Sequence, residues 1–230
     1  MPDALGPRLR AARMERGFSL RSVAEALGVS ASLISQVEIG KTQPSVSTLL
    51  ALASYLGVSL DELLGIQAGG SPQDAVFGHA GPELPDVQRA ADNPVIEMEN
   101  GVRWERLAAG KGGPADALLV TYEPGASSSI EGKLMRHAGL EYAYLIEGEL
   151  TLNLDFDTYV LHPGDSLQFD SVRPHLYTNH GKSVARGVWF VFGRRAHNQG
   201  LPDAPRGEQV PAGMPASAVD VLRAMDDIED

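Results

Sequence analysis

Residues 18–64 read FSLRSVAEALGVSASLISQVEIGKTQPSVSTLLALASYLGVSLDELL. Apolar residues recur at helical spacing through this stretch and through the residues before it, which is typical of short amphipathic helices that pack on one another. Four serines stand where a helix start needs a side-chain acceptor: Ser19, Ser30, Ser45 and Ser59. The pattern predicts an all-α bundle of about five helices over residues 1–66. Its predicted core is Leu9, Ala12, Val23, Ala26, Leu27, Ile34, Val37, Leu49, Leu52, Ala53 and Leu56.

Two of the predicted helices, 19–27 and 31–38, flank the three-residue turn Gly28-Val29-Ser30. With LRAARMERG ahead of them and QVEIGKTQPS behind, they resemble the Xre/Cro-type helix-turn-helix family, and the resemblance covers the whole first domain. It implies that the first helix crosses the DNA backbone while the second lies in the major groove. It also implies a buried structural ion pair between Arg13 and Glu38.

The second helix leaves short or amide side chains on its outer face, while Leu33, Ile34 and Val37 are expected to point inward. Gln36 is the best single candidate for a base contact, because its amide can bond an adenine edge with both ends. Basic side chains and helix-start amides position a protein on phosphates. The predicted DNA-binding residues are Arg21, Ser30, Ala31, Ser32, Ser35, Gln36, Lys41 and Ser45.

Composition limits the other possibilities. The chain has no cysteine, which excludes disulfides, thiolate zinc sites and cysteine nucleophiles. Residues 1–66 carry equal numbers of basic and acidic side chains, so the net charge of −11 lies entirely after residue 66. No apolar run is long enough for a signal peptide or a membrane span, and a cytoplasmic location with no membrane partner is expected.

The pattern of apolar residues changes after the helical bundle. Residues 67–94 contain several Gly and Pro without a sustained period, which indicates a linker. Residues 95–195 carry short β-prone runs between turn residues and predict an all-β sandwich or small barrel: VIEM (95–98), VRWERL (102–107), ALLVTY (117–122), YAYLI (142–146), LTLNL (150–154) and GVWFVF (187–192). Residues 196–230 read as a tail, with a short helix expected over 217–229.

Two motifs in the β region resemble the cupin family, a double-stranded β-helix barrel. MRHAGLEYAYLIEG (135–148) follows the first cupin motif, with Met135 in place of the first His, then His137 and Glu141. GDSLQFDSVRPHLYTN (164–179) follows the second motif and supplies His175. The predicted fold is therefore a multidomain α and β chain, an N-terminal helix-turn-helix bundle followed by a C-terminal cupin barrel.

Met135, His137, Glu141 and His175 are expected to line an effector pocket, and three readings of it stay open. In the first, His137, Glu141 and His175 hold one divalent metal ion, since two imidazoles and one carboxylate form the triad of non-haem Fe(II) sites. In the second, the same residues bind a polar small molecule without metal. In the third, they are satisfied polar groups of a β core. Met135 is a poor ligand for a hard ion, so a four-ligand site is not expected.

The favoured function is a sequence-specific, DNA-binding transcriptional regulator. Its partners would be a two-fold double-stranded operator, a second copy in a homodimer, and a small effector sensed by the cupin domain. One module buries only about 600–1,000 Å² on DNA, which is why a dimer is expected. The alternative is a mononuclear non-haem iron enzyme, because a phosphonate epoxidase family joins a similar helical region to a cupin with the same ligand spacing.

Overall fold

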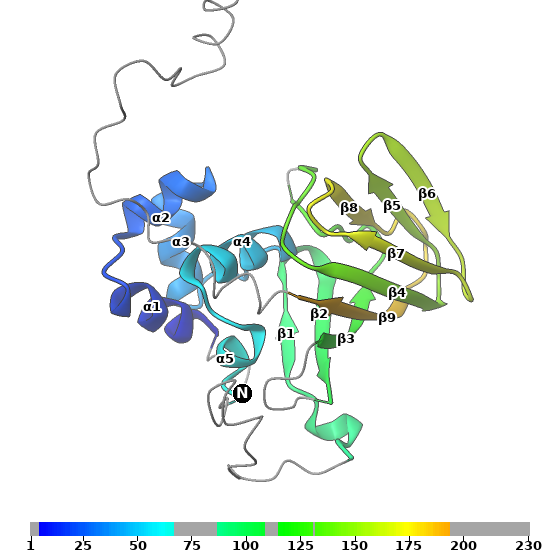
Figure 1. The fold of residues 1–230 in the computed structure, drawn as a ribbon, viewed down its shortest axis with the longest axis horizontal. Helices are drawn as coiled ribbons and strands as arrows, with labels where there is room; N and C mark the ends of the chain where they lie inside the picture. The colour runs from blue at the N-terminus through cyan, green and yellow to red at the C-terminus, as the bar shows by residue number, and fades with distance from the viewer. Residues whose placement is uncertain (1–4, 67–86, 109–114, 131, 194–230) are drawn as a thin grey trace, which may run out of the picture. The chain divides into compact units, whose positions relative to one another are not determined.

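The computed structural model describes residues 5–66, 87–108, 115–130 and 132–193. The first of these ranges forms five helices, as predicted: α1 Leu5–Glu15, α2 Leu20–Leu27, α3 Ala31–Glu38, α4 Val46–Leu56 and α5 Leu60–Leu64 (Figure 1). The tail from residue 196 and its expected helix over 217–229 lie outside the described residues, as do residues 67–86 of the expected linker. Among the described residues, no helix is long and apolar enough to cross a membrane.

The helix starts are fixed by the serines that the sequence singled out. Each serine side chain accepts a hydrogen bond from a backbone N–H in the first turn of α2, α3, α4 or α5. Ser59 and Glu62 complete a capping box at α5. Because α2 and α4 end at Gly28 and Gly57 in the left-handed conformation, with φ of 68° and 61°, both helices stop sharply. The turn between α2 and α3 is therefore encoded locally.

The helical core follows the predicted apolar positions, except that Leu27 is only half-buried and Ala26 lies outside the core. Leu9, Val23, Ile34 and Leu49 are fully buried. Ala26, however, is exposed on α2, and Ala24 is buried instead. The reason is the helical period, since Leu20, Val23, Ala24 and Leu27 follow i, i+3, i+4, i+7 spacing and Ala26 falls outside that face.

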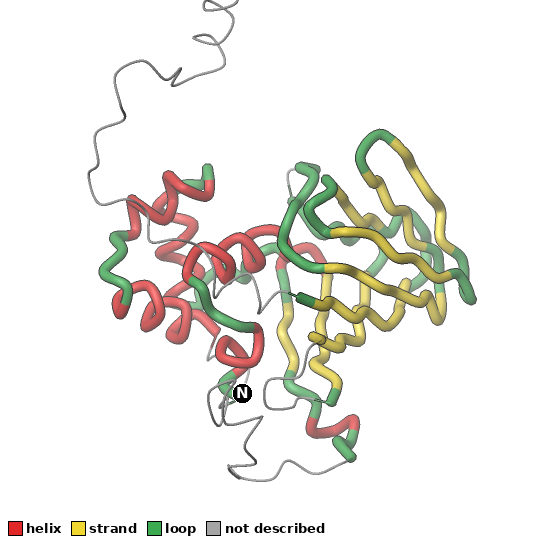
Figure 2. The backbone as a smooth tube through the Cα atoms, in the orientation of Figure 1, coloured by secondary structure: helices red, strands yellow, loops and turns green. Residues whose placement is uncertain are grey.

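The described residues between 95 and 192 form nine strands: β1 Val95–Glu97, β2 Val102–Leu107, β3 Ala115–Tyr122, β4 Leu140–Glu147, β5 Leu150–Leu154, β6 Asp157–Leu161, β7 Ser166–Asp170, β8 His175–Thr178 and β9 Ala185–Phe192. They pair antiparallel in two sheets, β1-β2-β3-β9-β4-β7 and β6-β5-β8 (Figures 1 and 2). The six predicted strand runs are all present, and this is the cupin architecture. The sequence had not singled out β6, β7 and β8.

The long sheet is built from strands whose side chains alternate between a buried and a more exposed face. The burial of β2, β3 and β9 alternates residue by residue. In β4, Glu141, Ala143 and Leu145 face the interior. Gly148 follows β4 at φ 77°, where a Cβ would lie 2.2 Å from the Val184 carbonyl oxygen, so a larger residue does not fit. The interior-facing residues of the motif strands therefore converge inside the barrel.

A buried ion pair links the helical domain to the barrel. Arg106 on β2 donates from Nε to Asp61 Oδ1 on α5 at 2.9 Å, and both side chains are almost fully buried. Arg106 also donates to the Leu107 and Ala117 carbonyl oxygens. The described end of the expected linker packs here too, because Gln88 donates to the Arg106 carbonyl oxygen at 2.8 Å. Residues 87–94 thus contact the barrel.

Candidate functional site

The outer face of α3 carries the residues predicted to read DNA. Ala31, Ser32 and Gln36 are exposed and Ser35 is half-buried, whereas Ile34 and Val37 are buried beneath them. Leu33, expected to face inward, is half-buried. The helix therefore presents short polar side chains outward, which allows close approach to a base edge.

The Arg13–Glu38 pair holds α1 against the end of α3. Arg13 donates from Nε to Glu38 Oε1 at 2.6 Å and from Nη2 to Oε2 at 2.8 Å, and both residues are buried. The side-chain hydrogen bond to Glu38 raises the pKa of Arg13. This two-point contact fixes direction as well as distance. The expected structural ion pair is present.

Gln36 is oriented by two neighbours. Its Nε2 donates to Ser32 Oγ at 3.4 Å, and Thr42 Oγ1 donates to its Oε1 at 3.2 Å. The amide is thus held in one direction on an exposed face. The role of Thr42 was not predicted, because it comes from the turn after the helix and no spacing rule links it to Gln36.

Two basic residues and two serines were expected near phosphates. Arg21 and Lys41 are exposed, and Ser30 caps α3 by accepting from Leu33 N–H at 3.1 Å. Ser45 is buried, and among the described residues its Oγ bonds to Ser47 and Thr48. The Ser47 N–H in the first turn of α4 donates to the Ser128 carbonyl oxygen of the barrel at 3.0 Å. In this arrangement the start of α4 contacts the barrel, and the phosphate contact expected of Ser45 stays a prediction.

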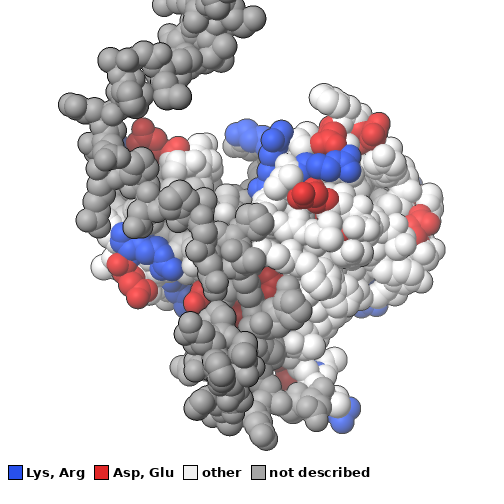
Figure 3. All heavy atoms as spheres, in the orientation of Figure 1, with Lys and Arg blue, Asp and Glu red and all other residues white. Residues whose placement is uncertain are grey.

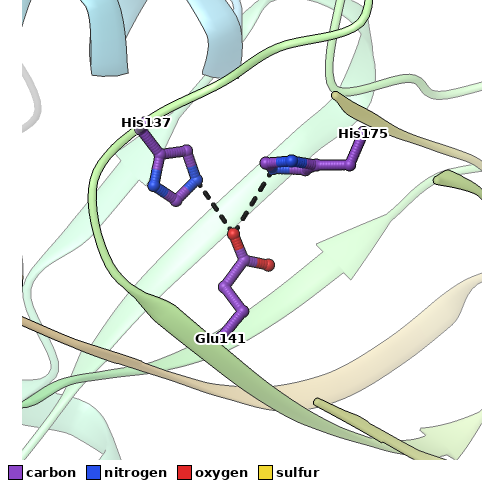
Figure 4. A group of neighbouring side chains, drawn as sticks. All are labelled: His137, Glu141 and His175. Carbon is purple, nitrogen blue, oxygen red and sulfur yellow. Dashed lines mark ion pairs between the residues drawn. The ribbon is translucent and has the colours of Figure 1, made fainter. Parts of the chain in front are cut away.

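The three polar residues of the cupin motifs come together inside the barrel (Figure 4). His137 Nε2 lies 2.9 Å from Glu141 Oε1, and His175 Nε2 lies 3.4 Å from the same oxygen. His137 precedes β4, Glu141 lies in β4 and His175 begins β8. The two motifs are joined by a pair of backbone hydrogen bonds between Met135 and His175, at 2.8 and 3.0 Å. One ligand atom from each of the three lies within 4.8 Å of the others.

The other nitrogen of each imidazole is held by the backbone. His137 Nδ1 lies 3.2 Å from the Ala138 carbonyl oxygen, and His175 Nδ1 lies 2.7 Å from the Arg173 carbonyl oxygen. Because a carbonyl only accepts, both Nδ1 atoms carry the proton. Both Nε2 atoms then face the carboxylate, and His175 Nε2 is buried without a hydrogen-bond partner. Such an arrangement is completed either by imidazole protonation or by a cation between the three groups.

Two hydroxyls fix the carboxylate. Ser171 Oγ donates to Glu141 Oε1 at 3.1 Å, and Tyr177 Oη donates to Oε2 at 3.0 Å. Neither role was predicted. A signal for Tyr177 did exist, because it lies two residues after His175 on one strand and therefore on the same face. Ser171 lies in the turn before β8 and offers no comparable periodicity.

The electrostatics of this cluster centre on Glu141. Burial raises the pKa of the Glu141 carboxyl, but the imidazoles of His137 and His175 stabilise the carboxylate when they are protonated, which outweighs burial and holds the pKa well below its usual range. Burial, and then the Glu141 charge, raises the pKa of Tyr122 and of Tyr177 well above the ordinary tyrosine value. Glu141 is therefore an anion and both phenols stay protonated at neutral pH.

A cavity of about 30 Å³ adjoins the cluster. Met135, His137 and Glu141 line it, as predicted for Met135, while His175 lies beside it through its contact with Glu141. The chain's two tryptophans, Trp104 and Trp189, also line it, and the Trp104 indole N–H is buried without a hydrogen-bond partner. The cavity is thus small and largely apolar, and the Glu141 carboxylate is the charged group in its wall.

Comparison with known proteins supports both domains. A family model described as Helix-turn-helix matches residues 9–63, and one described as Cupin domain matches residues 118–191. The HTH-type transcriptional regulator PuuR of Escherichia coli K12 is 30% identical over 187 residues, covering 80% of this chain and 91% of PuuR. The HTH-type transcriptional regulator SutR of the same strain is 26% identical over 182 residues, covering 78% of this chain and 89% of SutR.

A solved structure supports the fold across both domains. The crystal structure of an HTH_3 family transcriptional regulator from Vibrio cholerae matches with a TM-score of 0.57 and 20% identity, over 84% of this chain and 96% of that chain. With the oriented face of α3 and the polar cluster in the barrel, the match to PuuR over both domains decides the family. The chain belongs to the helix-turn-helix transcriptional regulators that carry a C-terminal cupin domain.

Proposed function

We propose that this protein is a sequence-specific DNA-binding regulator that reads its operator with the outer face of α3. The observation that carries the proposal is the oriented Gln36 amide, exposed on a helix that the buried Arg13–Glu38 pair fixes in place. Ser32 and Gln36 contact base edges, while Arg21 and Lys41 contact phosphates. Its expected cytoplasmic location stays a prediction.

DNA fragments that the purified wild-type protein selects from genomic DNA provide the test. Gln36→Ala is expected to lose discrimination at particular base pairs, by about 1–3 kcal/mol. Lys41→Ala is expected to weaken binding to all sequences and to lower the salt dependence by about one released counterion. If both variants lose the same affinity for selected and random DNA, α3 does not read sequence.

In the barrel we propose one divalent metal ion held by His137, Glu141 and His175. The fixed Nδ1 protons and the orphaned His175 Nε2 support this choice over a metal-free core, because they leave both imidazole lone pairs directed at the carboxylate. Two imidazoles and one carboxylate suit Fe(II) and neighbouring first-row ions. Bound there, the ion would supply a Lewis-acidic position for the head group of an effector.

The enzyme alternative has less support. The triad would also suit a non-haem iron oxidase. PuuR and SutR, which align with this chain over both domains, are transcriptional regulators. A sensing role accounts for His137, Glu141 and His175 without requiring a bound substrate or a chemical reaction at the metal.

The expected homodimer is assigned to the outer face of the long sheet. Tyr142, Tyr144 and Ile146 on β4 stand exposed beside Phe190 and Phe192 on β9. The space-filling view is largely free of charge over these strands (Figure 3). A second copy is the occupant that a two-fold operator requires, since two reading helices must act together.

A further inference from the structure

Two residues of the DNA-binding domain form part of the wall of the barrel cavity. Val46 and Leu50 lie one turn apart on α4, and both line the same space as His137 and Glu141. Both are buried, with 2% and 5% of their surface exposed. The cavity is therefore completed by the helical domain.

The size of the cavity limits what it can hold. Its volume of about 30 Å³ accommodates one or two water molecules, or an ion with a water. Pockets for organic ligands are typically about 300–1,000 Å³. An organic effector therefore enters only if one wall withdraws.

The walls differ in how firmly they are held. Trp104, Leu118, Val120, Trp189 and Val191 belong to β2, β3 and β9, which are hydrogen-bonded to their neighbours along their length. The start of α4 and the loop before it, in contrast, meet the barrel through two backbone hydrogen bonds, from Ser47 N–H to Ser128 O and from Glu99 N–H to Pro44 O. Withdrawing α4 together with the helical domain breaks these two hydrogen bonds and the Arg106–Asp61 ion pair, whereas opening the sheet breaks the hydrogen bonds along a whole strand.

We propose that α4 is the movable wall of the effector pocket, so that an organic effector binds between the barrel strands and Val46 and Leu50 and displaces α4 as it enters. The proposal rests on the proposed function of effector sensing. Signal transfer is then direct, because the same helix lines the pocket and packs in the core of the DNA-binding domain through Leu49 and Leu52.

The lining also indicates the chemistry of the ligand. The Trp104 indole N–H has no hydrogen-bond acceptor among the described residues, so a ligand that supplies one would satisfy it. The other side chains that line the cavity are mainly aliphatic and aromatic. The ligand class is thus a small molecule with an apolar body and an acceptor group, such as a carbonyl or carboxylate. Its body would occupy an enlarged space between Leu50 and the barrel strands.

A cavity-filling variant tests the movable wall in the full-length protein without DNA or effector. Val191→Phe adds bulk inside the cavity, whereas Val160→Phe makes the same substitution at an exposed position of β6, in the other sheet, and is the matched control. Amide exchange measured by NMR at Ser47 and Glu99 reports whether the contact between α4 and the barrel is closed. The Thr48 amide, capped by Ser45 within its own helix, is the internal reference.

Val191→Phe is expected to speed exchange at Ser47 and Glu99 by about fivefold or more, as overpacking of about 1 kcal/mol would. Exchange at the Thr48 amide, and at all three amides in the Val160→Phe control, should not change. Adding Leu50→Ala to Val191→Phe should restore protection, a rescue that general destabilisation would not produce.

Unchanged exchange at Ser47 and Glu99 in a folded Val191→Phe variant would overturn the proposal. If that variant loses protection throughout the barrel, Leu50→Trp applies the same expansion from the α4 side and is judged by the same amides. Because no DNA is present, failure here leaves the DNA-binding proposal standing, and loss of operator binding would not affect this result.

Discussion

At the scale of single residues, the polar cluster of the barrel depends on which atom of each imidazole faces Glu141. The backbone carbonyls of Ala138 and Arg173 settle this by holding both Nδ1 protons. Tyr177 then holds the second carboxylate oxygen, so Oε1 is directed at the two Nε2 atoms. The Ala138 and Arg173 carbonyls and the Tyr177 hydroxyl thus orient the three ligand atoms toward a common point without being ligands themselves.

The wild-type protein is expected to bind one divalent ion per chain, and Glu141→Gln is expected to lose it, because the neutral amide removes the charge that offsets the ion. Elemental analysis after dialysis against Fe(II), Mn(II) or Zn(II) measures the stoichiometry. His162→Ala is the matched control, since His162 is an exposed histidine outside the cluster. Equal metal content in wild type and Glu141→Gln would reject the site.

Tyr177→Phe tests the orientation of the carboxylate separately. Removing one hydroxyl keeps all three ligands but frees Oε2, and metal affinity should fall by about 10- to 100-fold. Competition with a chromophoric chelator measures the change. An unchanged affinity would mean that the hydrogen bond from Tyr177 Oη does not position Glu141.

At the scale of elements, α3 is held by its cap and by its ion pair. Ser30→Ala removes the acceptor for the Leu33 N–H and should lower the free energy of unfolding by about 1 kcal/mol. Urea denaturation followed by circular dichroism measures it. Ser54→Ala, at an exposed position inside α4, is the control and should be neutral or slightly stabilising.

Breaking the Arg13–Glu38 pair is expected to lower the free energy of unfolding more than removing the Ser30 cap does. Glu38→Ala leaves a buried guanidinium without its partner and should cost about 3–5 kcal/mol. Replacing both residues, as Arg13→Met with Glu38→Leu, should recover much of that loss, because no charge then remains buried. If the single and double variants are equally unstable in urea, packing rather than charge is what the pair contributes.

At the scale of the whole molecule, two reading helices require two chains. Tyr144→Glu places a charge in the exposed apolar face of β4 and β9 and should shift the protein from dimer to monomer. Light scattering coupled to gel filtration measures the mass. Tyr159→Glu alters a comparably exposed tyrosine on β6 of the other sheet and should leave the dimer intact.

Much of this architecture could be predicted from the sequence, since serine caps and apolar periodicity are local signals and the bundle follows them. The cluster of His137, Glu141 and His175 was found because two motifs carry it. Ala26 was wrongly assigned to the core because α2 has only eight residues, too few for its apolar pattern to show clearly which of two nearby alanines lies on the buried face. The burial of Ser45 and the position of Leu50 in the cavity wall were not predicted, because both depend on how α4 meets the barrel, which no local pattern encodes.

The two tryptophans of the chain, Trp104 and Trp189, both line the cavity and are nearly buried. All indole emission from this protein therefore originates around one small space. Entry of any compound, or admission of water as α4 withdraws, should alter the wavelength or the quenching of that emission. The unlabelled protein is its own optical sensor, and compound libraries can be screened for its effector by intrinsic fluorescence alone.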